Sequence, residues 1–69
     1  MYAQIQAQQN VNEAAYLLQN NVDVAMAHAS EINSFTATIN FFVHRGNFDR
    51  VLKESEDYKQ TARKWLGIE

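Results

Sequence analysis

The chain has 69 residues, no cysteine and a formal net charge of −2. This length allows one domain, residues 1–69, and the absence of cysteine excludes disulfides and cysteine-ligated zinc sites. The negative charge argues against a nucleic-acid-binding protein, whose affinity comes mostly from neutralising phosphates. Because so small a core leaves little net stability, we expect further stability from association into a homo-oligomer, a dimer or a higher bundle.

Residues 3–45 contain neither glycine nor proline and follow a heptad repeat. Apolar or small side chains at alternating four- and three-residue steps predict one long helix, roughly 60 Å at ~1.5 Å per residue. The Asn20-Asn21 pair is alternatively a turn, which would break this helix at 20–21 and give a three-helix bundle. The repeat defines a predicted oligomer interface of eight residues: Val11, Ala15, Leu18, Val22, Ala25, Ala29, Ile32 and Ile39.

Charge is distributed unevenly along this segment and the one that follows. All six lysines and arginines lie within residues 45–69, and the only acidic residues before them are Glu13, Asp23 and Glu31. A surface helix normally carries a charged face. We therefore expect residues 1–44 to be covered by other helices, including those of a second chain.

A chain reversal is predicted at Gly46-Asn47. Glycine favours the left-handed conformation that ends many helices, and asparagine is a good N-cap for the next one. A second, shorter helix is predicted over about 48–66, with Gly67 at its end. Its repeat consists of Val51, Ser55, Tyr58, Ala62 and Trp65. The predicted fold is therefore all-α, a helical hairpin that assembles into a coiled-coil-like bundle.

No pattern in the sequence indicates catalysis or a metal site. The early acidic residues are far apart, no Glu-x-x-His pair of the di-iron type is present, and no glycine-rich turn would hold a phosphate. We expect no enzymatic activity and no cofactor. One alternative remains open at His28, which could be an axial haem ligand if two copies paired in a helical bundle. Its other interpretation is a half-buried histidine beside the apolar repeat.

Two neighbouring aromatic residues, Phe41 and Phe42, are the candidates for contact with a protein partner. Successive helical positions point about 100° apart, so Phe42 fits the core side and Phe41 faces away from it. The most apolar stretch, residues 22–43, is interrupted by polar or charged residues, which argues against a membrane span. Among them are Asp23, His28, Glu31, Asn33 and Asn40. The N-terminus lacks the basic start and apolar core of a signal peptide, so we expect a cytoplasmic protein.

Residues 11–14, Val-Asn-Glu-Ala, are similar to a unit that recurs in the cytoplasmic signalling coiled coil of methyl-accepting chemotaxis receptors. The hairpin-tip motif of that family is matched by Leu17, Leu18, Asn21, Ala27, Ala29 and Glu31, with Val24 as a conservative replacement. The chain departs from the motif at Asn20, Ala25, His28 and Ser30. The resemblance implies a signal-transducing coiled coil, but no contact residues, because the matches are mostly packing positions.

The leading functional hypothesis is a non-enzymatic helical oligomerisation or protein–protein interaction module. A signalling coiled coil and a haem-binding bundle are the alternatives.

Overall fold

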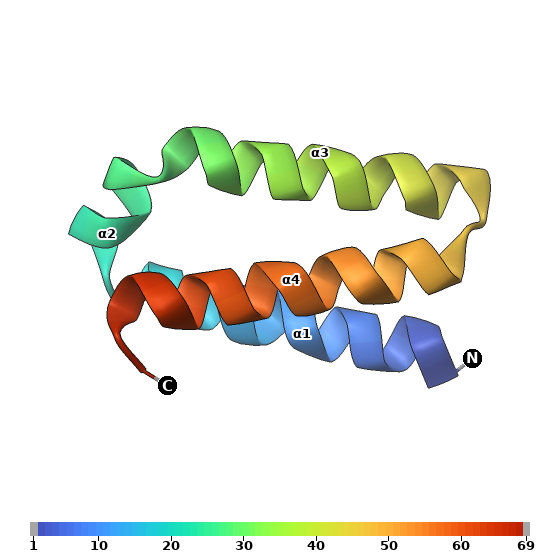
Figure 1. Cartoon of the computed structure of the whole chain (residues 1–69), viewed down its shortest axis with the longest axis horizontal. Helices are drawn as coiled ribbons and strands as arrows, with labels where there is room; N and C mark the ends of the chain where they lie inside the picture. The colour runs from blue at the N-terminus through green and yellow to red at the C-terminus, as the bar shows by residue number, and fades with distance from the viewer. Residues whose placement is uncertain (1, 69) are drawn as a thin grey trace.

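The computed structural model describes residues 2–68, and in that range it contains four α-helices and no strand (Figure 1). The helices are α1 (Tyr2–Gln19), α2 (Val22–Ala27), α3 (Ala29–Arg45) and α4 (Phe48–Leu66). The all-α prediction is confirmed, as are the reversal after Arg45 and the helix over 48–66. No helix within residues 2–68 is long and apolar enough to cross a membrane.

The single helix predicted over residues 3–45 does not form. Helix α1 ends at Gln19, the chain turns at Asn20-Asn21, and a second interruption follows at His28. The break at 20–21 is the one that the alternative prediction placed there. A continuous helix would leave the first half of the apolar repeat bare within one chain. Turning back loses a few helical hydrogen bonds but lets α1 bury a face on α4, and such packing supplies most helix stability in proteins.

The reversal between α3 and α4 is built as predicted. Gly46 has a φ of 73°, in the left-handed region, and its N–H donates to the Val43 carbonyl at 3.0 Å. The next N–H, of Asn47, reaches back to the Phe42 carbonyl at 3.0 Å, which completes a glycine C-cap. The Asn47 side chain then accepts a hydrogen bond from the Arg50 N–H at 3.3 Å and caps α4.

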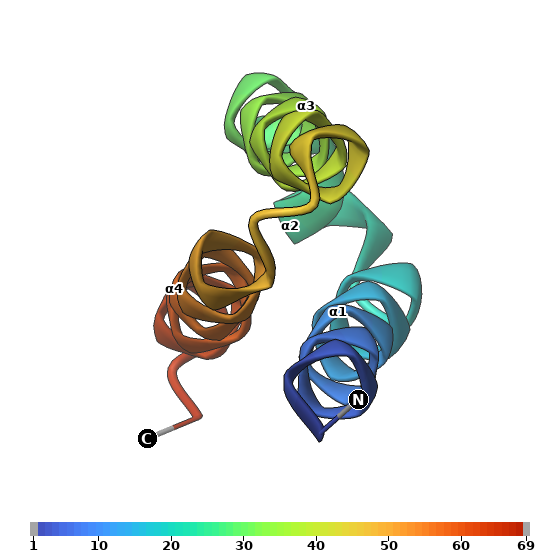
Figure 2. The same ribbon diagram turned by 90° about the vertical axis from the view of Figure 1, so that its right-hand side faces the viewer.

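The three long helices form an open V in which α4 is the shared member (Figure 2). Helix α4 packs along both α1 and α3, whereas α1 and α3 make at most marginal direct contact. Helix α3 runs antiparallel to α4, and α1 runs parallel to it (Figure 1). The gap between α1 and α3 is therefore the open side of the molecule.

The contact between α1 and α4 is made largely by small side chains. Ala7 and Ala14 of α1 and Ser55 and Ala62 of α4 are all buried, and small residues allow two helices to approach closely. On this face Asn10 and Ala14 are buried, each one position before Val11 and Ala15 of the predicted repeat, whereas Leu18 belongs to both sets. Val11 is only half-buried as a result and lies at the edge of the contact.

Candidate interaction surface

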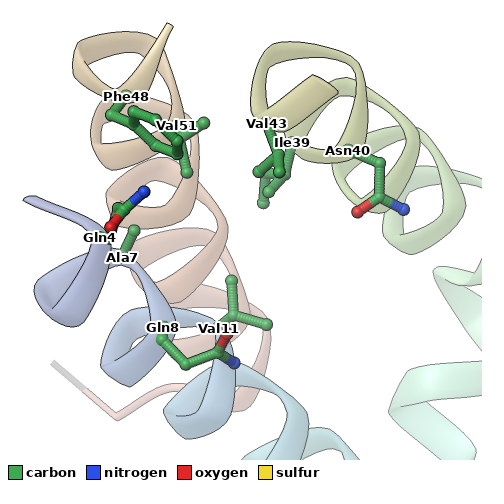
Figure 3. Close-up of a pocket in the computed structure, with 9 residues that line it drawn as sticks. All are labelled: Gln4, Ala7, Gln8, Val11, Ile39, Asn40, Val43, Phe48 and Val51. Atoms are coloured by element: carbon green, nitrogen blue, oxygen red, sulfur yellow. The ribbon is translucent and has the colours of Figure 1, made fainter. Parts of the chain in front are cut away.

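Two clefts occupy the open side of the V, between α1 and α3, with α4 as their floor. The first has a volume of about 440 Å³ and lies near the Gly46 turn (Figure 3). It is lined by Gln4, Ala7, Gln8, Val11, Ile39, Asn40, Val43, Phe48 and Val51. The second has a volume of about 490 Å³ and is lined by Ala15, Leu18, Gln19, Val22, Ala25, Met26, Ala29, Ile32, Asn33 and Tyr58. We call the two clefts together the α1–α3 groove.

None of the described side chains that line the α1–α3 groove carries a charge. The walls consist of aliphatic and aromatic groups, with glutamine and asparagine amides between them. Ion pairs lie on other faces: Arg63 bonds Glu13 at 3.0 Å, and Arg50 bonds Glu54 at 3.3 Å. The scarcity of charged residues before residue 45 thus leaves the walls of the groove uncharged.

All eight residues of the predicted oligomer interface line this groove, although they come from three helices and not from one. Leu18 and Ile39 are buried in the chain's own core. Val11, Ala25 and Ile32 are half-buried, and Ala15, Val22 and Ala29 are exposed. The residues of the heptad repeat therefore lie along the two clefts, although the helix that the repeat predicted is broken, and their role in an oligomer interface stays a prediction.

The most exposed apolar side chains of the α1–α3 groove lie at the α2 end. Val22 is 59% exposed and Met26 is 72% exposed. Helix α2 itself has no buried residue. Apolar side chains clustered at the surface beside a cleft are typical of interaction sites.

Phe41 and Phe42, the candidates for partner contact, do not line the groove. The Phe42 ring packs against the core and lies beneath the Arg50 guanidinium, 5.1 Å from the ring centroid. Phe41 is 53% exposed and meets Phe42 edge-to-face at 5.2 Å. The Arg45 guanidinium lies 5.0 Å from the Phe41 ring centroid. Phe42 thus contributes to packing within the chain, and Phe41 belongs to a different surface from the groove.

His28 packs against α4 within its own chain. Its ring stacks on Trp65 with a centroid distance of 4.0 Å and an interplanar angle of 5°, and its Nδ1 lies 3.5 Å from a Glu31 carboxylate oxygen. Across the described part of the chain, no group of three or more His, Cys, Asp or Glu side chains is placed to hold a metal ion.

The His28 stack is one step of an aromatic ladder that sequence analysis missed. The second step pairs Phe35, seven residues after His28, with Tyr58, seven residues before Trp65. Their ring centroids are 5.2 Å apart. Burial raises the pKa of the Tyr58 phenol because its ionised form is poorly solvated there. The two aromatic residues before the Gly46 turn and the two after it are both seven residues apart. This equal spacing could have predicted the two stacks, since antiparallel helices align heptad positions in opposite order.

A buried polar contact between α1 and α4 was also missed. Asn10 is 1% exposed and Ser55 is 0% exposed. The Asn10 side-chain amide donates to the Ser55 Oγ at 3.1 Å, and that hydroxyl donates to the Leu52 carbonyl at 2.7 Å. The Gln6 side-chain amide donates to the Asn10 Oδ1 at 3.1 Å. A polar pair in an otherwise apolar contact favours one alignment of the two helices over its neighbours.

The chain gives no significant match to protein-family models, to curated proteins or to solved structures. The similarity to chemotaxis receptors therefore rests on the residues quoted above. In this fold they lie on α1, in the turn after it, on α2 and at the beginning of α3.

Proposed function

We propose that this chain is a non-enzymatic helical interaction module that self-associates through the α1–α3 groove. The observation that carries the proposal is the uncharged lining of the groove along both of its walls. The partner is a second copy of the chain.

Charge explains why a second copy fits this face. Each copy has a net charge of −2, so two copies repel each other weakly. Docking through the groove buries no charged side chain, so it avoids the desolvation that makes buried ions costly. The exposed side chains of Val22 and Met26 would leave water in the process.

The groove is long enough for a stable contact. Its α1 wall belongs to a helix of 18 residues, or about 27 Å at 1.5 Å per residue. A standard interface buries about 800 Å² on each partner. The described surface of the chain measures 4680 Å², so such an interface would take about one sixth of it. In the dimer, α1 and α3 of both copies would form a central four-helix layer, with the two α4 helices outside.

Sedimentation equilibrium of the full chain at micromolar concentration tests the proposal. The matched pair of variants is Ala15→Glu, in the groove, and Ala37→Glu, on the exposed surface of α3 outside it. We expect a wild-type dimer whose Kd rises at least about tenfold in Ala15→Glu, because each copy would bury an unpaired carboxylate. Ala37→Glu should leave the Kd unchanged. A monomeric wild type, or equal effects of the two substitutions, would contradict the proposal.

A further inference from the structure

We infer that two copies of this chain associate by exchanging α1, each α1 packing on the α4 of the other copy, with Asn20-Asn21 as the hinge. The inference rests on the self-association proposed above and adds a second contact between the copies, because each groove is then lined by the α1 of one copy and the α3 and α4 of the other. It is carried by three observations: the construction of the hinge, the heptad repeat that crosses it, and the contacts that hold α1.

The turn at Asn20-Asn21 lacks the features that specify the Gly46 turn. It is closed by two backbone hydrogen bonds, from the Asn20 N–H to the Tyr16 carbonyl at 3.2 Å and from the Asn21 N–H to the Leu18 carbonyl at 3.1 Å. Both residues are exposed, and neither is glycine or proline. The Asn21 side chain forms no cap to α2, and its amide donates instead to the Leu17 carbonyl at 2.8 Å. The Gly46 turn differs, because a left-handed glycine and a capping asparagine specify it. Opening the hinge into helix would exchange the Asn21 side-chain bond and the Asn21 N–H bond to Leu18 for helical backbone hydrogen bonds between the last turn of α1 and α2.

The apolar repeat keeps its phase across the hinge. Ala15 and Leu18 precede it, and Val22 and Ala25 follow it at unchanged four- and three-residue steps. If residues 19–22 become helical, these four side chains fall on one face. In the closed chain, Ala15 and Val22 are exposed. Two open copies crossing at their hinges would cover them with the same residues of the partner, which is a two-fold symmetric contact.

The contacts that hold α1 can be transferred between copies without change. Helix α1 packs chiefly on α4, through the Asn10–Ser55 hydrogen bond and the Glu13–Arg63 ion pair, and hardly touches α3. Each of these contacts can form with the α4 of a second copy in the same geometry. Exchange therefore requires no new surface complementarity, which is why it is a low-cost route to dimers. The stack of His28 on Trp65 holds α3 to the α4 of its own chain and places the hinge before residue 28.

A mixing experiment with two single-cysteine variants tests the exchange. Asn10→Cys and Ser55→Cys, whose parent side chains touch at 3.1 Å, are mixed as separate full-length chains, equilibrated and oxidised. Exchange predicts a covalent dimer on a denaturing, non-reducing gel. Mixing Asn10→Cys with Ser34→Cys, on the exposed surface of α3, should give none. The double variant in one chain shows that the two cysteines can join. If it cross-links only within the chain and the mixture gives no covalent dimer, the inference is wrong.

A charge-exchange pair provides a second test that leaves the core intact. Glu13→Arg and Arg63→Glu each replace the α1–α4 ion pair with two like charges. In an exchanged dimer that contains one copy of each variant, both pairs become attractive again, whereas in unexchanged chains both remain repulsive. Native mass spectrometry of the mixture should show mixed dimers above the statistical proportion, and a statistical proportion would count against exchange. A chain that remains monomeric refutes both proposals. A dimer without mixed disulfides refutes the exchange alone.

Discussion

The buried contact between Asn10 and Ser55 makes a sharp prediction about stability. Replacing Ser55 with alanine removes the hydroxyl that accepts from Asn10, in a place where Asn10 is 1% exposed and water has little access. Leaving a buried donor without its acceptor costs about 1–3 kcal/mol. The Leu52 carbonyl loses less, because it lies within α4 and accepts a backbone hydrogen bond there as well.

One opposing term can be worked out from helix propensity. Alanine is more favourable than serine in a helix by about 0.5 kcal/mol, so a mid-range penalty leaves a net loss of about 1.5 kcal/mol. In a domain of this size, that loss lowers the Tm by about 6–12 °C. Ser34→Ala is the matched control, because Ser34 is exposed on α3. It should gain the propensity term and become slightly more stable.

The assay is thermal and urea unfolding followed by circular dichroism at one fixed chain concentration, since association would shift the apparent stability. The two serine variants should move in opposite directions. If Ser55→Ala is as stable as Ser34→Ala, then the Asn10–Ser55 bond does not hold α1 on α4. A double-mutant cycle with Asn10→Ala should give a coupling energy of about 0.5–3 kcal/mol, and additive effects would lead to the same conclusion.

Three further predictions follow from the turn and the aromatic ladder. Gly46→Ala should lower the urea midpoint by the equivalent of about 1 kcal/mol with an unchanged m-value, because an alanine is strained at a positive φ. A steric clash is not the cause, since no atom lies within 4 Å of the added methyl. An unchanged midpoint would contradict this prediction. Trp65→Ala should destabilise the fold by about 2 kcal/mol, less than the loss of a fully buried tryptophan would. It should also move the His28 ring protons downfield in NMR spectra, because the stack is lost. Unmoved ring protons would show that the stack does not form in solution. Burial raises the pKa of Tyr58 above its usual 10.0. The contribution of the neutral phenol to stability is therefore fully present below pH about 10 and is lost as the pH rises through the folded-state pKa. Tyr58→Phe should remove this loss in urea titrations at high pH, and a pH profile identical to that of the wild type would refute the prediction.

The heptad repeat predicted which side chains line the two clefts but not the shape of that surface. That these residues form an oligomer interface stays a prediction. All eight predicted interface residues line one groove, because a heptad repeat reports which side chains share a face wherever the helix persists. The Asn10–Ser55 contact was not predicted. A buried asparagine and an exposed one look the same in a sequence until the partner that satisfies the amide is known.

The amino-acid sequence by itself determined the features that depend on neighbouring residues. Among these are the helical state of the described chain, the glycine reversal at Gly46, the bounds of α4 and the face of α4 that carries Val51 and Tyr58. The turn at Asn20-Asn21 was decided by the tertiary structure. Asparagine pairs are compatible with a turn and with a helix, and the local energies of the two differ little. The choice depended on whether α1 could bury Ala7, Asn10 and Ala14 against a helix more than forty residues away. Such burial is a long-range interaction, and no local pattern in residues 1–44 records it.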